Sequence, residues 1–252
     1  MNRPMDGADL QDELAPSSYA AWFDSDLGQR VWRDERRALE RAMGEVAGRR
    51  VLDVGAGEGR FARELVLRGA RVVALDRSEA MLRAGGITRE GLHPEPVMGD
   101  ALELPFADES FDVVVAVTVL CLLDGAGDAA RELARVTRPG GRVVLGELGR
   151  WSTWALARRG EALLKGGLWS TVRFRTAPEL RKILADAGLQ PGDVHGAVFY
   201  PRSALAARLL GRVDPWLGQR TTVGAAFLAV GSAKPSPQAT APRGRARLGR
   251  HD

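Results

Sequence analysis

The chain has 252 residues, an apolar share of 45% and a formal net charge of +4. This length fits one large α/β domain or two small ones, and the apolar share is ordinary for a globular protein. A single cysteine, Cys121, excludes an internal disulfide and cysteine-rich zinc sites, and it favours a cytoplasmic location. The small basic excess is mostly arginine and does not require a polyanionic partner.

Nothing in the sequence predicts a targeting or membrane-spanning segment. Residues 1–12 are polar and acidic, without the apolar stretch of a secretory signal. The longest apolar run, residues 113–123, is shorter than the roughly 20 residues of a membrane helix and reads as a buried strand. We therefore expect no export and no membrane partner.

The first elements in the chain are one or two amphipathic helices. Tyr19, Trp22 and Phe23 follow Pro16, and apolar residues at 31, 39 and 43 then recur among charged residues at roughly helical spacing. Residues 1–15 before them are expected to be a flexible N-terminus.

From residue 50, short aliphatic runs alternate with helical patterns. The runs VLDVG, RVVALD, FDVVVAVTV and GRVVLGEL are separated by segments such as FARELVLRG and AARELARV. This rhythm is typical of βαβ units with a parallel sheet. Gly69, Gly140 and Gly141 stand where helices should end and strands begin, and Ser78 is placed to cap a helix.

The last third of the chain is less regular. Thr176 and Glu179 form a capping-box pair that opens a helix ending at Gly188. A strand is expected over residues 193–200, a helical insertion broken by Pro215 over residues 202–219, and a final strand over residues 221–230. Residues 234–252 are basic, rich in proline and poor in large apolar residues, so we expect a disordered tail after a domain spanning residues 16–233.

A glycine-rich turn follows the first strand. In DVGAGEG, three glycines at every second position let the backbone turn sharply and approach a ligand closely. A dinucleotide fingerprint needs glycine at position 60, where this chain has Arg60, while Gly59 comes one residue early. The spacing therefore disfavours NAD or FAD.

This turn resembles the first motif of the class I S-adenosylmethionine-dependent methyltransferases, and LDVGAGEGR matches it without a gap. The resemblance spans roughly residues 19–230 and is closest to the small-molecule, methyltransferase type 11-like branch. It implies a Rossmann-like doubly wound α/β fold, with seven mostly parallel strands, the last antiparallel, after N-terminal helices. It also implies S-adenosylmethionine as cofactor, with the carboxylate of its methionine part near exposed N–H groups at a helix start.

The same resemblance assigns cofactor-binding residues along the chain. An acidic residue at the end of the second strand can accept hydrogen bonds from both ribose hydroxyls, and one after the third can reach the adenine amino group. The end of the fourth strand faces the cofactor and its methyl group. The implied residues are Asp53, Gly55, Ala56, Gly57, Gly59, Asp76, Arg77, Asp100, Ala101, Leu102, Val117 and Thr118. Cys121 more often is a small buried residue than a nucleophile.

The acceptor side of the site is less defined. Tyr19, Trp22 and Phe23 resemble the opening of some relatives, in which the N-terminal helix covers the active site, or they are aromatics packed in the core. Trp151, Trp154 and Trp169 likewise either line an apolar acceptor pocket or pack helices on the sheet. A sulfonium methyl is already electrophilic, so neither a covalent nucleophile nor a metal is required. A general base for a hydroxyl acceptor could be Tyr19, His93, His195 or Glu147, and the catalytic residue stays unassigned.

Three alternatives stay open beside methyl transfer to a small-molecule acceptor. A nucleotide-dependent oxidoreductase is disfavoured by Gly59 and Arg60. A non-catalytic S-adenosylmethionine-binding module is not excluded by any sequence feature. A nucleic-acid methyltransferase is unlike this chain, because no Asn-Pro-Pro-Tyr motif follows the fourth strand. We expect a monomer or a homodimer.

Overall fold

The structure is a computed structural model that describes residues 16–85 and 94–236. The helices are α2 (Pro16–Asp24), α3 (Asp26–Met43), α4 (Arg60–Leu67), α5 (Glu79–Ala84), α6 (Ala126–Val136), α7 (Thr153–Lys165), α8 (Ala177–Asp186), α9 (Ala204–Leu210) and α10 (Asp214–Leu217), with short 3₁₀ turns at Leu120–Leu122 and Leu168–Ser170. The strands are β1 (Arg50–Val54), β2 (Arg71–Asp76), β3 (Glu95–Met98), β4 (Phe111–Val117), β5 (Thr137–Leu148), β6 (Gln190–Ala197) and β7 (Phe227–Ala233).

The seven strands form one sheet in the order β3-β2-β1-β4-β5-β7-β6. Neighbouring strands from β3 to β5 are parallel, whereas β7 runs antiparallel to both β5 and β6. This confirms the doubly wound fold with an antiparallel last strand. The chain reverses its winding direction between β1 and β4, and ligands of such sheets bind outside the carboxyl ends of the strands at that point.

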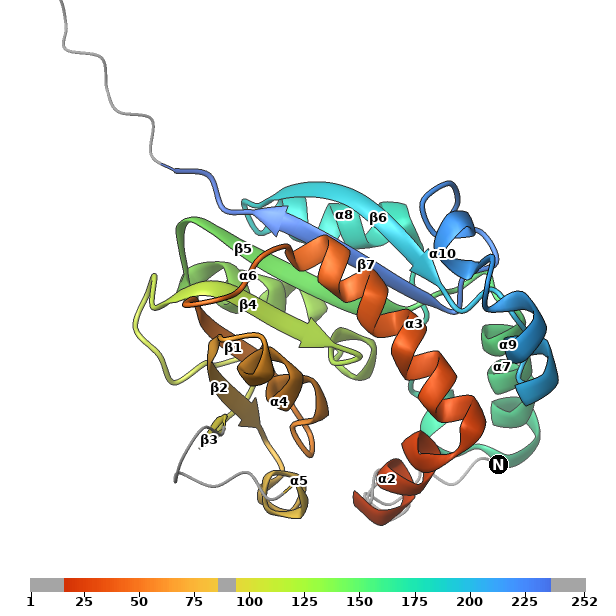
Figure 1. Ribbon diagram of the computed structural model, residues 1–252. Coiled ribbons are helices and arrows are strands. Elements are labelled where there is room, and N and C mark those ends of the chain that lie inside the picture. Colours follow the sequence, from red (N-terminus) through yellow and green to blue (C-terminus); the bar gives the residue numbers. More distant parts are fainter. Residues whose placement is uncertain (1–15, 86–93, 237–252) are drawn as a thin grey trace, which may run out of the picture.

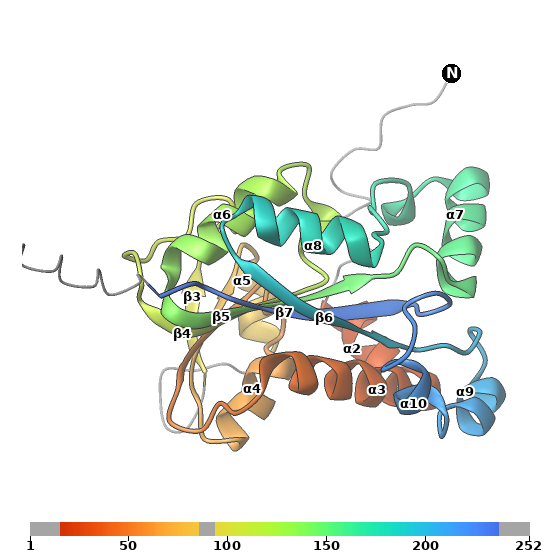
Figure 2. The same cartoon turned by 90° about the horizontal axis from the view of Figure 1, so that it is seen from above.

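Helices cover both faces of the sheet, with α6 and α8 on one face and α3 and α4 on the other (Figure 2). Alternate strand residues supply the two cores because side chains of a strand point to opposite faces. Val113 and Val115 of β4 pack in the α3 and α4 layer, while Val114 and Ala116 pack in the α6 and α8 layer. The hydrophobic strands are therefore buried on both sides, as a parallel sheet requires.

Helix α3 packs unusually close to the sheet. A Cβ at Gly231 of β7 would overlap the carbonyl oxygen of Ala42, and a Cβ at Gly146 of β5 would lie 2.9 Å from Cδ2 of Leu39. The helix crosses the sheet diagonally, and its N-terminal part continues past the carboxyl end of β4 toward α2 (Figure 1). Small residues on the sheet thus bring α3 down over the edge where the expected site lies.

Two predicted caps are confirmed. The Ser78 side chain accepts a hydrogen bond from Met81 N at the start of α5. Thr176 and Glu179 form the complete capping box of α8, and Gly188 follows that helix with a φ of +79°. These local signals were readable from the sequence because each needs only residues three or four positions apart.

Several predicted boundaries were wrong. β5 begins at Thr137, so Gly140 and Gly141 lie inside the strand, where the pairing with β4 is irregular. The predicted strand 193–200 is Gln190–Ala197, and the predicted strand 221–230 is Phe227–Ala233. Pro215 lies in the first turn of α10 rather than interrupting a helix, because the first turn needs no proline N–H.

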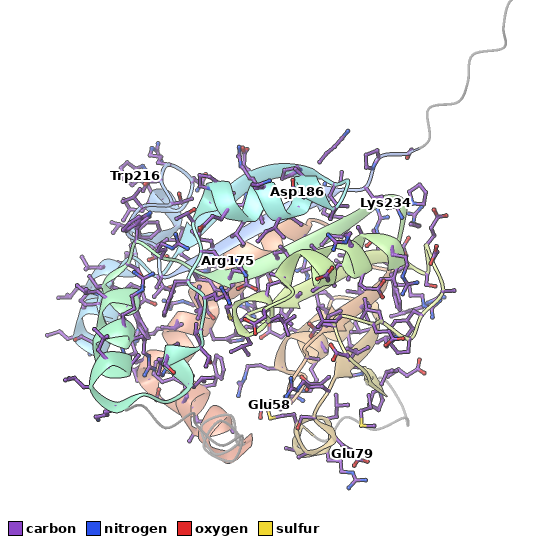
Figure 3. All side chains as sticks on the ribbon, turned by 180° about the vertical axis from the view of Figure 1, so that it is seen from behind. Glu58, Glu79, Arg175, Asp186, Trp216 and Lys234 are labelled. Carbon is purple, nitrogen blue, oxygen red and sulfur yellow. The ribbon has the colours of Figure 1, made fainter. Side chains whose placement is uncertain are left out.

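The fold also extends past the predicted domain end. The Nζ atom of Lys234 donates to the carbonyl oxygens of Ala134 at 2.9 Å and Thr137 at 2.7 Å, which closes the end of α6 onto β7 (Figure 3). Lys234 therefore belongs to the domain and not to the tail. Most of the predicted tail, and the N-terminus 1–15, lie outside the described residues.

The close approach of α3 predicts a stability effect. Gly231→Ala should lower the free energy of unfolding by about 1–3 kcal/mol, because the added methyl group forces α3 away from β7. The control is Gly160→Ala in α7, where nothing lies within 4 Å of the new Cβ, so stability should stay equal or rise by up to about 1 kcal/mol. Urea unfolding measures both, and equal effects of the two substitutions would contradict the packing argument.

Candidate cofactor and acceptor site

The glycine-rich turn adopts a backbone that only glycine takes readily. Gly55, Gly57 and Gly59 have φ values of +70°, +56° and +71°. A Cβ at Gly55 would overlap the Val119 side chain, and a Cβ at Gly57 would lie 3.2 Å from Cε of Met81. The first and second glycines therefore allow neighbouring elements to close on the turn, in addition to giving it its shape.

The carboxylate of Asp76 links this turn to the end of β2. Its Oδ2 accepts from Gly57 N at 2.8 Å, and its Oδ1 accepts from Ser78 N at 2.8 Å. Each oxygen of an ionised carboxylate has room for a further hydrogen bond, so ribose hydroxyls could still be held there. The structure thus brings together the turn and the acidic residue that the sequence predicted as partners.

Four N–H groups of the turn donate to acceptors within the protein. The N–H groups of residues 55 and 56 donate to the carbonyl oxygen of Leu75, that of residue 57 to Asp76, and that of residue 59 to the carbonyl oxygen of Ala56. The turn therefore offers a ligand close backbone approach, and side-chain charges nearby can add to what the start of α4 offers a zwitterion.

Asp53 supplies such a charge beneath the turn. Only 2% of this residue is exposed, and its Oδ2 has no hydrogen-bond partner among the described residues. Burial, with the nearby Asp76 adding to it, raises the pKa of the Asp53 carboxyl to about 7. A buried carboxylate with an unpaired oxygen suits an ammonium group, such as that of the methionine part of S-adenosylmethionine.

The residues after β3 lie beside Asp76. Gly99 N donates to the carbonyl oxygen of Asp76 at 3.1 Å, and Oδ1 of the exposed Asp100 accepts from Leu102 N at 2.9 Å. Ala101 is buried under this turn, and Arg77 is exposed. The residues expected to surround an adenosyl group therefore lie near one another after the ends of β2 and β3. Their role in binding stays a prediction.

The end of β4 lies beside the glycine-rich turn, on the side of β1 that faces away from β2. Thr118, directly after Val117, has a φ of +53° and donates its N–H to the carbonyl oxygen of Gly146 at 2.7 Å. A left-handed backbone is unfavourable for a β-branched residue, so the surrounding contacts hold it there. Its neighbour Val119 packs on Gly55, so the end of β4 lies beside the turn. The role of Val117 and Thr118 in cofactor binding stays a prediction.

The buried Glu147 holds the segment that follows β4. It is fully buried, its Oε1 accepts from Leu120 N at 2.9 Å, and Arg175 donates to the carbonyl oxygen of Leu120 at 3.1 Å. Burial raises the pKa of Glu147 to about 7, and the positive charge of Arg175 opposes that rise. Glu147 thus anchors the segment after β4, and Cys121 in that segment is buried as expected.

Phe23 of α2 contacts the residue that follows the turn, and Trp22 of the same helix contacts α7. The Arg60 guanidinium, directly after Gly59, lies 4.7 Å from the ring centre of Phe23. The rings of Trp22 and Trp154 meet edge to face at 5.9 Å. Of the other tryptophans, Trp169 stacks on Phe174, and Trp151 is exposed. Trp154 is therefore the tryptophan of α7 that contacts the helix covering the site.

The predicted base candidates separate in space. His93 and the side chain of Tyr19 lie outside the described residues. His195 lies on the edge strand β6 and lines a cavity of about 20 Å³ with Asp34 and Asp214, four strands away from β1. Glu147 is fully buried, with Oε1 accepting from Leu120 N and Oε2 without a hydrogen-bond partner among the described residues. None of the described candidates is therefore placed to reach an acceptor beside the turn.

Sequence analysis missed Glu35. It lies on the sheet-facing side of α3, between buried Val31 and Leu39 at a spacing of four residues in each direction. Leu39 packs on Gly146, so Glu35, one turn closer to the N-terminus, lies beyond the carboxyl end of β5. Burial, and secondarily Asp34, raises the pKa of Glu35 to about 8. A glutamate within the apolar stripe of α3 was the signal that could have identified it.

In the described part of the chain, no group of three His, Cys, Asp or Glu residues could hold a metal ion. A search of the same residues finds no helix long and apolar enough to cross a membrane.

Comparisons with known proteins agree with this geometry. A family model described as "Methyltransferase domain" matches residues 52–145. The chain is 37% identical to the demethylmenaquinone methyltransferase of Thermobifida fusca over 188 residues, covering 68% of this chain and 79% of that protein. It is 40% identical to the demethylmenaquinone methyltransferase of Renibacterium salmoninarum over 146 residues, covering 58% and 60%, so it spans less than two thirds of the second relative.

The fold is also shared with solved structures. A SAM-dependent methyltransferase from Thermotoga maritima superposes with a TM-score of 0.69 at 21% sequence identity, covering 90% of this chain and 99% of that one.

Asp76 gives a direct test of the cofactor site. Asp76→Ala should weaken S-adenosylmethionine binding by about 1–3 kcal/mol, because the substitution removes the expected ribose contact and releases Gly57 N. Isothermal calorimetry measures it, with Asp186→Ala on the exposed face of α8 as a control that should bind normally. An unchanged affinity in Asp76→Ala would count against the assignment.

Asp53 predicts a pH effect on the stability of the cofactor-free protein. Its folded pKa of about 7 lies above the usual 3.8, so its contribution is fully present below about pH 4 and is lost as pH rises through about 7. Relative to wild type, Asp53→Asn should therefore gain at least about 1 kcal/mol of unfolding free energy over that range. Urea unfolding at several pH values measures the difference, and parallel curves would show that Asp53 is not buried as described.

Proposed function

Because the chain belongs to the class I S-adenosylmethionine-dependent methyltransferases, we propose that it transfers the methyl group of this cofactor to a small aromatic acceptor of the quinol type. The observation that carries the proposal is the junction of the glycine-rich turn with Asp76 through Gly57 N. Beside it lies the unpaired Oδ2 of Asp53. Together they offer a site for a ribose and an ammonium group at one edge of the sheet.

The bound cofactor supplies an electrophilic methyl group on sulfur. In our proposal Asp53 holds the ammonium group, Asp76 the ribose hydroxyls, and Asp100 the adenine amino group. Val117 and Thr118 border the methyl group, and α2 excludes water from above. The work of the protein is then to place the acceptor atom in line with the S–CH₃ bond, roughly 3 Å from the carbon.

Two observations support an aromatic acceptor. The relatives from Thermobifida and Renibacterium are named for methyl transfer to demethylmenaquinone, a quinone. In this chain, Trp22 and Phe23 of α2 and Trp154 of α7 border the region over the turn, and aromatic rings pack well on such side chains. We propose the reduced, hydroxylated form as acceptor, because a ring that carries an ionised hydroxyl is the better nucleophile.

Glu35 is our candidate for the base that removes this proton. A carboxylate with a pKa raised by burial is a stronger base than an ordinary glutamate, and a pKa near working pH is favourable for proton transfer. In the balanced step, the acceptor hydroxyl gives its proton to Glu35, the ring carbon next to that oxygen forms the bond to the methyl carbon, and the methyl–sulfur bond breaks with its electron pair on sulfur. The same ring carbon then loses its own proton to solvent, which restores the aromatic ring.

The remaining expectations stay predictions. These are a cytoplasmic enzyme, a monomer or homodimer, and domain limits at residues 16 and 233 as amended by Lys234. Calorimetry with NADH tests the oxidoreductase alternative, in which NADH would bind and S-adenosylmethionine would not.

Transfer of labelled methyl from S-adenosylmethionine tests the function itself. With reduced short-chain naphthoquinones we expect labelled product, and with oligonucleotides we expect none. Binding of the cofactor without transfer to any tested acceptor would instead support a non-catalytic module.

Glu35→Gln tests the base. The substitution should lower kcat about a hundredfold, since the amide cannot accept the proton. In the wild type, kcat/KM should rise with pH and level off above about 8, because Glu35 must be ionised to act. The variant should lose this rise, while Glu40→Gln on the same helix should keep it. Normal activity of Glu35→Gln would assign the proton transfer to another group or to solvent.

A further inference from the structure

Helix α7 exposes an apolar stripe to solvent. Leu163 and Leu164 are 88% and 87% exposed, and Leu156 is exposed on the same side of the helix, seven and eight residues earlier. Ala155 is fully buried, and Trp154 is partly buried against the core. The three leucines of α7 are thus exposed, whereas a helix of a globular protein usually turns its large apolar residues inward.

The segment that follows β6 repeats the pattern. Leu205, Leu209 and Val213 recur every four residues and are all exposed, and Trp216 is 55% exposed in α10. Single exposed apolar residues are common, but stripes on two neighbouring elements form a patch of the kind that marks an interaction site.

Contacts link α7 with the residues that precede α9. Arg202, just before α9, bonds to Glu161 of α7 at 2.7 Å. The indole N–H of Trp154 in α7 donates to the carbonyl oxygen of Tyr200 at 2.7 Å. In two views α7 and α9 lie at the same end of the molecule (Figures 1 and 2), and Trp216 lies at that end as well (Figure 3). We call this surface, formed by α7, α9 and α10, the leucine face.

The leucine face is strongly basic. Residues 151–165 and 201–220 contain seven arginine or lysine residues and two acidic ones. Both acids are engaged, because Glu161 pairs with Arg158 and Arg202, and buried Asp214 accepts from the N–H groups of residues 198 and 199. The exposed basic residues other than Arg202, which pairs with Glu161, are Arg159, Lys165, Arg208, Arg212 and Arg220.

We propose that the leucine face docks on the surface of a bilayer that contains anionic lipids. Exposed leucines and a tryptophan suit the boundary between headgroups and acyl chains, and surrounding arginines and lysines suit anionic headgroups. A second copy of this chain is a poorer occupant, because two copies of the face would bring like charges together. The docking is peripheral, as no described helix could span the bilayer.

The leucine face lies near the candidate site, which gives the proposed docking a role in the reaction. α7 follows the carboxyl end of β5 and α9 follows that of β6, so the leucine face lies at the same edge of the sheet as the glycine-rich turn. The inner side of α7 meets α2 through Trp154 and Trp22. A docked molecule would thus present its proposed acceptor region close to the lipid surface. This departs from our expectation of no membrane partner.

Vesicle sedimentation of the full chain tests the docking without any methyl transfer. We expect the protein to sediment with vesicles of equal parts phosphatidylcholine and phosphatidylglycerol, and to stay in solution with phosphatidylcholine alone or at high salt. The triple variant Leu163→Glu, Leu164→Glu, Leu209→Glu should weaken this binding roughly tenfold or more. It should keep its helical circular dichroism and its affinity for S-adenosylmethionine, since all three side chains are exposed.

The matched control is Leu67→Glu at the end of α4, which is 87% exposed and lies at the opposite edge of the sheet. It should bind vesicles like the wild type. Equal binding of the triple variant, or no binding by the wild type, would overturn the proposal. So would light scattering that shows a dimer for the wild type and a monomer for the triple variant, because a second copy would then cover the face.

Discussion

The candidate site depends on one hydrogen bond, from the N–H of Gly57 to the carboxylate of Asp76. This bond ties the turn after β1 to the end of β2, and the Ser78 N–H fixes the other carboxylate oxygen. The turn can make it only because glycines tolerate its left-handed backbone. The N–H groups of residues 55 and 56 tie the turn to Leu75 of the same strand, and the Gly57 bond adds the carboxylate expected to hold the ribose to this fixed arrangement.

Three carboxyl groups with raised pKa values lie at this edge of the sheet. Asp53 is buried under the turn and Glu147 under the segment after β4, and the partly buried Glu35 lies above on α3. Removal from water raises the pKa of each one, so a cationic or proton-donating ligand would offset part of that cost. Glu147 Oε1 accepts from Leu120 N, whereas Asp53 Oδ2 and Glu147 Oε2 have no hydrogen-bond partner among the described residues.

Helix α7 lies between the proposed acceptor region and the outer surface of the protein. Its inner side carries Trp154, which contacts α2 and the backbone of Tyr200. Its outer side carries Leu163 and Leu164 in the leucine face. One helix thus borders the acceptor region on one side and solvent on the other. An acceptor that arrives from a membrane at the leucine face would have to pass only α7 to reach the proposed acceptor region.

The sequence by itself determined the alternation of strands with helices in the first part of the sheet and the glycine-rich turn, because apolar runs and short-range spacing express them locally. It also determined the caps at Ser78 and Thr176, each made within three residues. Only the tertiary structure decided the order of the strands, the limits of β5 to β7, the role of Lys234 and the surroundings of Glu35. It also decided that the leucines of α7 face outward. Those features depend on which side of an element its neighbours cover, and periodicity shows that a stripe exists without showing what lies against it.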